Sequence, residues 1–426
     1  MESLAKNILK EDINEFHLSD RFINDMKLRY EKLWWQVEGT CLPFSRIYDN
    51  REKKKNKKAI KKAINKLSME INRINQQEMD KELVTNNIKE IIKNFFQDIL
   101  DYDEKKIDII FNRGYMETTN EFIKRTKEFE PDIKIEDIFQ AIRNVWIANS
   151  IQIFLGEDVR LSDSIFGYSM LYPYSDNYLD DPDLSIEEKT KFNKKFSKML
   201  RGKEIGINNK HEKDVLKLVR LMEKQYDRLI YRDVYTSIYA IHGAQKKSVL
   251  QQYGQVSPYE RNIIDITFEK GGTSVLADGY LVSGRLSKEV AEFMFGYGVI
   301  LQLADDLQDV NEDFKNSHCT IFSQVAKKWP LDKLTNKLIN YINKVLDSAE
   351  FITTNNGKVI KEIIRENCYN LIFMAIYKNK GLYTREYIKS IERYSMLYFR
   401  DYKKIEKSFK KLYKSFDNES LYIIKD

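Results

Sequence analysis

The sequence predicts an all-α protein built as a single large helical bundle. Glycine and proline number only 16 and 6 among 426 residues, well below their average usage of roughly 7% and 5%. Few residues are therefore left for the turns of a many-stranded sheet. Apolar residues recur every three or four positions along most of the chain, as on helices with one buried face. With 42% hydrophobic residues, the chain can form a large core.

The first 83 residues are expected to form an N-terminal helical extension. The segment from Lys53 to Lys66 is strongly basic. An apolar stripe follows helical spacing through and beyond it: Ile60, Ile64, Leu67, Ile71 and Ile74. A basic amphipathic helix can rest on an anionic membrane, which makes this segment a candidate peripheral membrane contact. The alternative is a solvated outer face that serves solubility.

Residues 84–426 are expected to form one continuous helical domain, because no Ser/Gly-rich linker divides them. Prolines, Pro173 among them, are expected to stop helices. The expected helices are 84–102, 103–128, 134–155, a short polar helix within 181–209, then 212–252, 259–283, 286–313, and two to four more after Leu331.

Charge and cysteine content exclude several classes of protein. The formal net charge of +6 is too small to indicate a nucleic-acid partner by itself. The three cysteines and four histidines are scattered, so no zinc pattern occurs. The N-terminus has acids where a secretory signal needs an apolar core, and no uncharged stretch reaches the roughly 18 to 20 residues of a membrane span. A cytoplasmic protein is expected.

One segment changes from uncharged to strongly acidic within a single expected helix. Residues 293–304 carry no charge, which in a helix indicates burial on all sides. Asp305, Asp306 and Asp309 follow at once. Asp305 and Asp309 share a helix face, where like charges repel by a few tenths of a kcal/mol. Such a crowded helix end favours a bound cation.

A second acidic cluster follows the largely apolar residues 165–174. Asp176 and Asp180 share a face, and Pro182 biases Asp181 away from helical geometry, so the cluster is expected at a helix C-terminus. The helix dipole there disfavours each carboxylate by roughly 0.3 to 1 kcal/mol. Oxygen ligands favour Mg²⁺, with Mn²⁺ as the alternative. Either cluster alone fits an ordinary acidic surface; two clusters facing each other would hold metal ions and a diphosphate above an apolar cavity.

These residues resemble a known family. Leu301 to Asp309, LQLADDLQD, resembles the second aspartate-rich motif of trans-prenyltransferases, and Asp176 to Asp181 takes the place of the first, as DxxxDD rather than DDxxD. The stretch EKGGTS from Glu269, followed by VLADG, resembles the Lys-Thr helix kink of the same fold. The pattern, over about residues 165–325, is most similar to the large (class IB) terpene synthases of bacteria.

The resemblance implies an isoprenoid synthase (class I terpenoid synthase) bundle. Its implied activity is that of a Mg²⁺-dependent terpene synthase, a lyase that converts a linear C15 to C35 prenyl diphosphate to a hydrocarbon or alcohol. The implied metal ligands are Asp176, Asp180, Asp181, Asp305, Asp306 and Asp309, with Asp176, Asp180, Asp305 and Asp309 as the catalytic acids. Lys270 and Lys315 are candidates for contacts to the diphosphate, and surface lysines are the alternative reading of both.

The candidate pocket lining lies on two further stretches. Tyr235, Tyr239, His242 and Gln245 recur at three or four residues and give one face of aromatic and polar groups. Such a face can line a carbocation pocket, although an aromatic stripe is more often core. Tyr172, one turn before Asp176, and Gln302 of the second motif complete the expected lining: Tyr172, Tyr235, Tyr239, His242, Gln245 and Gln302.

The sequence leaves two alternatives to the terpene synthase open. Chain-elongating prenyltransferases usually carry two arginines shortly after the first motif, whereas the first arginine here is Arg201. That absence favours ionisation of one substrate, but a DDxxD second motif keeps a trans-polyprenyl diphosphate synthase as the first alternative. The second is a non-catalytic helical interaction protein whose acidic helix ends are surface features. The oligomeric state stays undetermined.

Overall fold

The computed structural model describes residues 16–40, 44, 46–75, 81–181, 183–252, 257 and 260–414, and within them every regular element is a helix. The predicted all-α class is therefore confirmed. The helices are α2 (Asp20–Gln36), α3 (Asn50–Asn75), α4 (Lys81–Leu100), α5 (Glu104–Asn112), α6 (Tyr115–Phe129), α7 (Ile135–Phe154), α8 (Asp163–Asp180), α9 (Ile186–Leu200), α10 (Lys210–Gln225), α11 (Arg232–Ser248), α12 (Ile263–Ser283), α13 (Lys288–Gln308), α14 (Val310–Lys315), α15 (Ile321–Val325), α16 (Asp332–Asp347), α17 (Asn355–Lys378), α18 (Arg385–Glu392) and α19 (Phe399–Lys414), with short 3-10 turns η1 (Val249–Gln252) and η2 (Lys380–Leu382).

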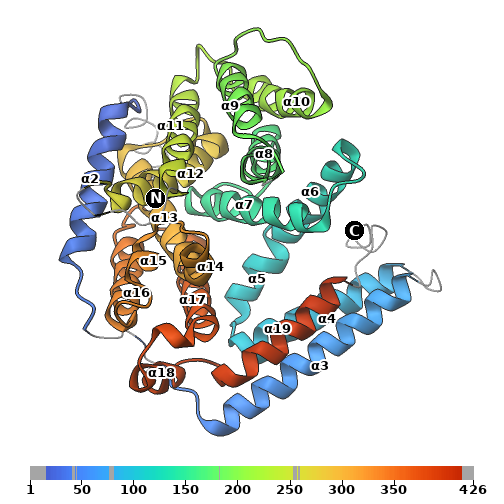
Figure 1. Cartoon of the computed structure of the whole chain (residues 1–426). Coiled ribbons are helices and arrows are strands. Elements are labelled where there is room, and N and C mark those ends of the chain that lie inside the picture. Colours follow the sequence, from blue (N-terminus) through green and yellow to red (C-terminus); the bar gives the residue numbers. More distant parts are fainter. Residues whose placement is uncertain are drawn as a thin grey trace.

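Four helices, α7, α8, α12 and α13, pack together at the centre of the molecule (Figure 1). Asn144 of α7 donates to Ser169 Oγ of α8 over 3.1 Å and to Asp278 Oδ1 of α12 over 2.9 Å. One turn further along α8, the hydroxyl groups of Tyr172 and Ser274 share a hydrogen bond of 2.7 Å. Residue numbers thus rise on α8 where they fall on α12, so these two helices run antiparallel.

Glycines allow α12 and α13 to approach each other closely. A Cβ atom at Gly298 would lie 2.0 Å from the carbonyl oxygen of Gly271, a distance no side chain can occupy. Near the other end of the contact, Gly279 of α12 faces Met294 of α13. The two helices are therefore also antiparallel. It follows that α8 and α13 both end at the side of the group where α12 begins.

The N-terminal helix α2 belongs to the main core. Its Trp34 packs edge-to-face against Phe268 of α12 and Tyr341 of α16, with ring centroids 6.3 and 5.3 Å apart. Burial of large aromatic rings contributes strongly to a core of this kind. Of the two helices described before α4, α2 thus lies in the main core, whereas α3 belongs to a separate apolar cluster.

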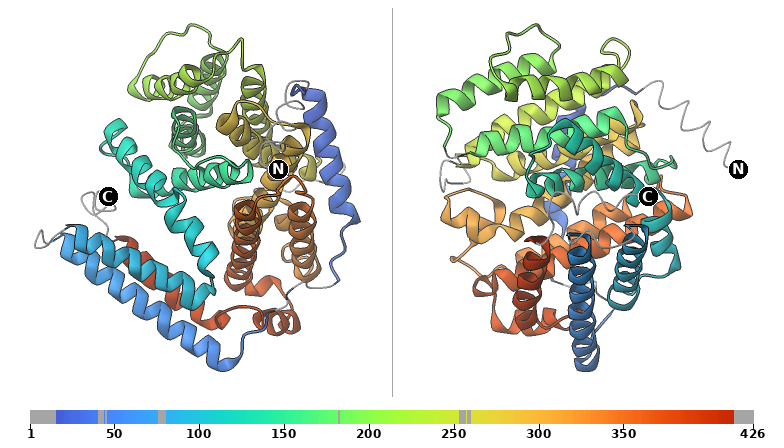
Figure 2. Two further views of the ribbon diagram at one scale, coloured as in Figure 1. Left: turned by 180° about the vertical axis from the view of Figure 1, so that it is seen from behind. Right: turned by 90° about the vertical axis from the view of Figure 1, so that its right-hand side faces the viewer.

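Three helices, α3, α4 and α19, form a separate layer at one side of the molecule (Figures 1 and 2). A small apolar cluster holds them together: Ile60, Ile64, Ile71, Ile99, Leu397, Ile405 and Leu412. Four residues of the stripe predicted on α3, Ile60, Ile64, Leu67 and Ile71, are thus covered by α4 and α19 and are not free to enter a membrane, and the side chain of Ile74 lies outside the described residues. Lys53 and Lys57 also point inward, where Lys53 Nζ donates to the carbonyl of Glu392 and Lys57 Nζ lies 2.7 Å from Asp401 Oδ1. The expected domain boundary at residue 83 falls in the first turn of α4.

Some helix boundaries differ from the expected ones. Segment 103–128 is divided into α5 and α6 at Gly114, whose φ of +94° suits glycine and whose Cβ would lie 2.8 Å from Val159. Segment 212–252 is divided at Tyr226, which has an extended backbone. Pro173, in contrast, does not stop α8. The helix continues with one backbone hydrogen bond fewer, because packing against α7 and α10 holds it.

Candidate functional site

The end of α13 holds carboxylates in different environments. Asp305 and Asp309 are exposed, whereas Asp306 and Asp313 are only 6% and 9% exposed. Gln302, one turn earlier, donates from Nε2 to Asp306 Oδ1 over 2.8 Å. The second oxygen of Asp306, Oδ2, is buried and has no hydrogen-bond partner among the described residues. One carboxylate oxygen is therefore held in place while the other stays available.

These carboxylates are difficult to ionise together. Burial, with the neighbouring Asp305 and Asp313, raises the pKa of Asp306 to about 7. Burial and the same neighbours raise the pKa of Asp309 to about 6. The pKa of Asp305 is also raised, chiefly because the surrounding protein partly shields its carboxyl group from water, although the residue as a whole is exposed. A divalent cation beside these carboxyl groups would favour their ionised forms.

Three cations from other helices act on this end of α13. Arg143 of α7 and Lys270 of α12 oppose the rise in the pKa of Asp305, and Lys378 of α17 opposes that of Asp309. Arg143 and Lys378 are exposed and Lys270 is half-buried, and among the described residues none of the three has a hydrogen-bond or ion-pair partner. Carboxylates and cations from three other helices thus act on one another at this end of α13, an arrangement suited to a metal-bound anion.

Other acids close to this region are fully paired. Asp265, in the first turn of α12, lies 2.5 Å from both Lys27 Nζ and Lys247 Nζ. Glu269 lies 3.1 and 2.6 Å from the same two ammonium groups. Although burial raises the pKa of Asp265, the hydrogen bonds from the two lysines leave it below its ordinary value. In contrast to Asp265 and Glu269, the carboxylates at the end of α13 form no ion pair with a described lysine or arginine.

The first acidic motif lies at the end of α8. Asp176 and Asp180 belong to its last two turns, and their side chains lie outside the described residues. Asp181 is the C-cap residue and is half-buried. Its Oδ1 accepts a hydrogen bond of 2.9 Å from the backbone N–H of Asp183. This bond turns the chain away from the helix, and it occupies one of the oxygens expected to bind metal.

Two contacts fix the end of α8 beside the beginnings of α7 and α12. The bond between Tyr172 and Ser274 lies one turn before Asp176 on α8 and one turn after Lys270 on α12. Because these helices are antiparallel, the backbone of Asp176 is level with that of Lys270. Asn177 donates to two side chains in the first turns of α7, over 2.8 and 3.0 Å. The structure therefore brings both acidic helix ends to one end of the central group.

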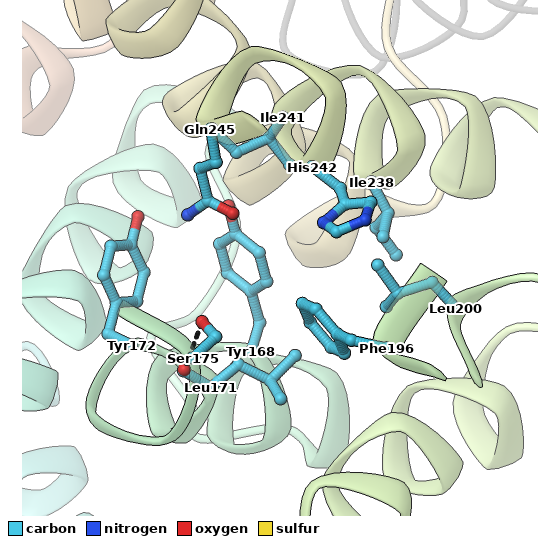
Figure 3. A pocket seen from close by; sticks show the side chains of 10 residues that line it. All are labelled: Tyr168, Leu171, Tyr172, Ser175, Phe196, Leu200, Ile238, Ile241, His242 and Gln245. Carbon is cyan, nitrogen blue, oxygen red and sulfur yellow. Dashed lines mark hydrogen bonds between the residues drawn. The ribbon is translucent and has the colours of Figure 1, made fainter. Parts of the chain in front are cut away.

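A small pocket lies between α8, α9 and α11 (Figure 3). Three of the predicted lining residues, Tyr172, His242 and Gln245, belong to it. The other lining residues are Tyr168, Leu171, Ser175, Phe196, Leu200, Ile238 and Ile241. Its volume is about 30 Å³, which is close to that of a single water molecule in the liquid.

His242 is the one histidine among the residues that line this pocket. Burial, assisted by Lys246 and Arg201, lowers its pKa to about 4, so the ring is neutral at pH 7. The ring stands edge-on to Phe196 with centroids 5.1 Å apart, and Nε2 has no partner among the described residues. The pocket thus combines aromatic faces with one uncharged ring nitrogen.

The structure places three predicted lining residues outside this pocket. The hydroxyl of Tyr235 donates to the carbonyl of Tyr226 over 2.6 Å, and the guanidinium of Arg228 lies 4.1 Å above its ring. Arg228 also donates to the hydroxyl of Tyr239 over 3.1 Å. The loop that follows α10 therefore covers the first turns of α11, which helical spacing alone does not reveal. Gln302 binds Asp306 instead.

Lys315 is exposed on α14, and its contact to a diphosphate stays a prediction. Arg143 of α7, which was not predicted, acts together with Lys270 on the carboxyl of Asp305. No motif marks Arg143. The only signal in the sequence is a single charged residue within the otherwise uncharged residues 138–154.

A buried polar network below the acidic helix ends was also not predicted. Asp278 is 2% exposed; its Oδ1 accepts the hydrogen bond from Asn144, and its Oδ2 has no partner among the described residues. Burial raises the pKa of Asp278 well above its usual range, because the surrounding protein disfavours the charged form. A lone polar residue in an apolar helix, such as Asn144 or Asp278, is the signal that could have indicated it.

The donors suit a hard metal ion. They are carboxylate oxygens, which Mg²⁺ prefers, and the orphaned Oδ2 of Asp306 is the kind of atom such an ion would bind. Among the side chains that the structure describes, no three His, Cys, Asp or Glu residues converge closely enough to hold a metal ion. Asp176 and Asp180 are not in that set.

Fold and site together define an all-α protein whose two acidic helix ends lie at one end of a central helical group. No protein-family model, no curated protein and no solved structure matches this chain. Within the described residues, no helix has both the length and the apolar character that crossing a membrane requires.

Proposed function

We propose that this protein is a Mg²⁺-dependent class I terpene synthase that ionises a linear prenyl diphosphate to a hydrocarbon or alcohol. The observation that carries the proposal is the shared position of the ends of α8 and α13, with Arg143 and Lys270 beside them. The resemblance of residues 165–325 to large terpene synthases supports the same activity. A surface role would not require acids from two helices and unpaired cations from two more at one place.

The metal ligands in this proposal come from both acidic helix ends: Asp176, Asp180, Asp305, Asp306 and Asp309. When bound, Mg²⁺ would act as a Lewis acid that neutralises the diphosphate leaving group. Asp181 is a weaker candidate because one of its oxygens already accepts the backbone N–H of Asp183.

The chain's own groups would bind and orient the substrate. Arg143 and Lys270 would supply positive charge to the diphosphate oxygens through charge-assisted hydrogen bonds. Gln302 would keep Asp306 oriented through the bond to Oδ1. The rings of Tyr168 and Tyr172, which line the pocket next to the end of α8, would stabilise positive charge on the prenyl chain through their quadrupoles.

A prenyl tail needs more room than the pocket between α8, α9 and α11 provides. Its volume is about 30 Å³, whereas small-molecule pockets usually measure roughly 300 to 1,000 Å³. The proposal therefore requires side chains such as Tyr172 and Gln245 to rotate when substrate binds. It follows that a prenyl diphosphate should protect the phenol of Tyr172 from a tyrosine-modifying reagent.

Diphosphate release tests the proposed activity. The purified chain is incubated with Mg²⁺ and farnesyl, geranylgeranyl or geranylfarnesyl diphosphate, and with EDTA in a parallel reaction. Asp305→Asn should lower the rate by at least about a hundredfold, equivalent to about 2.7 kcal/mol of transition-state stabilisation. Asp158→Asn, at an exposed aspartate between α7 and α8 and outside both motifs, is the matched control and should retain the rate. Unchanged release by Asp305→Asn would refute the assignment, and no metal-dependent release with any substrate would favour the non-catalytic interaction protein.

The DDxxD form of the second motif keeps chain elongation as a second candidate function. Adding isopentenyl diphosphate to the same reactions separates the two activities. Extractable hydrocarbons or alcohols would support the terpene synthase. Diphosphates longer than the substrate would support the trans-polyprenyl diphosphate synthase instead.

A further inference from the structure

Positive charge is strongly concentrated in two helices of the outer layer. α3 and α19 together contain 17 Lys and Arg against four Asp and Glu, a net charge of +13. The whole chain has 71 Lys and Arg against 65 Asp and Glu, a net charge of +6. The residues outside α3 and α19 therefore have 54 Lys and Arg against 61 Asp and Glu, a net charge of −7. The two helices are far apart in sequence, but they pack against each other (Figure 2). The fold therefore gathers a basic region on an otherwise acidic molecule.

The lysines of these helices face solvent while the apolar residues face inward. On α3, Lys58, Lys62 and Lys66 are exposed on the side opposite the isoleucines that contact α4 and α19. On α19, Lys404, Lys407 and Lys411 are exposed, whereas Ile405 and Leu412 are buried. We refer to these two exposed lysine faces as the basic surface. Because the apolar side of each helix is already used, only charge remains for a partner.

The acids of the two helices do not neutralise the basic surface. No Asp or Glu occurs between Lys53 and Met69. Asp401 of α19 is buried and binds Lys57. Among the described residues, none of the side-chain ammonium groups of the six lysines that define the basic surface has a hydrogen-bond or ion-pair partner. Neighbouring lysines four residues apart on one helix repel each other, so an anionic partner would relieve an existing repulsion.

The side chains of the basic surface fit a membrane better than a nucleic acid. Of its two helices' 17 basic residues, 14 are lysines, which act as hydrated point charges, whereas arginine is preferred for recognising nucleic-acid phosphates and bases. α3 contains no aromatic residue on which a base could stack. Met69, which is 59% exposed, lies in the same solvent-facing arc of α3 and offers one apolar side chain to an interface.

From these observations we infer that the basic surface of α3 and α19 binds anionic lipid membranes peripherally, through electrostatic attraction. The attraction of lysines to anionic lipids acts within a Debye length of the surface. Binding of this kind is reversible and sensitive to salt, because no apolar helix face is inserted. The inference does not depend on the proposed catalytic function.

Co-sedimentation of the full chain with vesicles tests the inference. The vesicles contain phosphatidylcholine alone, or phosphatidylcholine with phosphatidylserine, at about 0.1 M and about 1 M salt, where the Debye length falls from roughly 10 Å to roughly 3 Å. The chain should bind only the anionic vesicles, and only at the lower salt concentration. Two triple variants, Lys58→Glu/Lys62→Glu/Lys66→Glu on α3 and Lys404→Glu/Lys407→Glu/Lys411→Glu on α19, should each weaken binding by at least about tenfold.

A control variant matches the charge change at other places. Lys124→Glu/Lys213→Glu/Lys358→Glu alters three exposed lysines of α6, α10 and α17 by the same total charge. It should change vesicle binding much less than either test variant, and circular dichroism should show that all three variants remain folded. Equal losses in control and test variants, binding that resists high salt, or no binding to anionic vesicles would overturn the inference. Tighter binding to duplex DNA or RNA than to the vesicles would also overturn it, in favour of a nucleic-acid surface.

Discussion

Replacing Asp306 by asparagine should change how the stability of the protein depends on pH. The folded-state pKa of about 7 lies above the ordinary value of 3.8, chiefly because of burial. Below about pH 4 the carboxyl is largely protonated in both the folded and the unfolded state, so its ionisation does not make the free energy of unfolding depend on pH. Between that pH and about pH 7 the unfolded state loses its proton first, so the free energy of unfolding falls as the pH rises. Each unit of difference between the folded and unfolded pKa corresponds to about 1.4 kcal/mol, so the free energy of unfolding falls by at most about 4 kcal/mol over this range.

Urea denaturation in EDTA at about pH 5 and about pH 8 measures this effect. The wild-type protein should lose stability between the two pH values, and Asp306→Asn should lose less because it has no carboxyl to ionise at this position. Mg²⁺ should restore stability to the wild type at the higher pH and do so less for the variant, since the ion favours the ionised carboxylates. Asp158→Asn, at an exposed site, should follow the wild type. Parallel pH profiles for the wild type and Asp306→Asn would refute the reasoning.

Three further substitutions test the packing that positions the site, each by its free energy of unfolding. Gly298→Ala should destabilise by about 1 to 3 kcal/mol or more, because its Cβ would meet the facing carbonyl of α12. Gly243→Ala, in open space on α11, should instead stabilise by roughly 0.5 to 1 kcal/mol, and similar effects at both sites would argue against the close contact. Ile64→Ala should destabilise by about 2 to 5 kcal/mol, since Ile64 is 5% exposed between α3 and its neighbours. Met69→Ala on the solvent side should change stability by less than about 0.5 kcal/mol, and an equally small effect of Ile64→Ala would mean that the three-helix layer does not pack as described. Asn144→Ala should destabilise by about 1 to 3 kcal/mol because it leaves a buried carboxyl without its donor, and an unchanged value would show that the network contributes little.

Much of the helical architecture follows from local patterns. The scarcity of glycine and proline, together with three- and four-residue apolar spacing, correctly predicts helices on most of the chain. The uncharged residues 293–304 are almost all buried, as their composition indicates. Gly114 and Pro173 show the limit of this reasoning. The positive φ of Gly114 occurs where the chain packs against Val159, and Pro173 is tolerated within α8 because neighbouring helices hold that helix in place.

The candidate site could be predicted only in part. The spacing of Asp305, Asp306 and Asp309 places them at one helix end, and the structure agrees. Spacing does not show which face of a helix the preceding loop will cover, and for that reason Tyr235 and Tyr239 were expected in a pocket from which the structure excludes them.

The sequence by itself determined the helical class, the buried character of α13 and the acidic ends of α8 and α13, since each depends on residues within a few turns of one another. Only the tertiary structure decided that α8 and α13 end on the same side, that Arg143 and Lys270 lie beside Asp305, and that α19 lies along α3. Such pairings depend on antiparallel packing between segments that are distant in the chain. Close glycine contacts and a few buried hydrogen bonds fix that packing, and local periodicity carries no information about either.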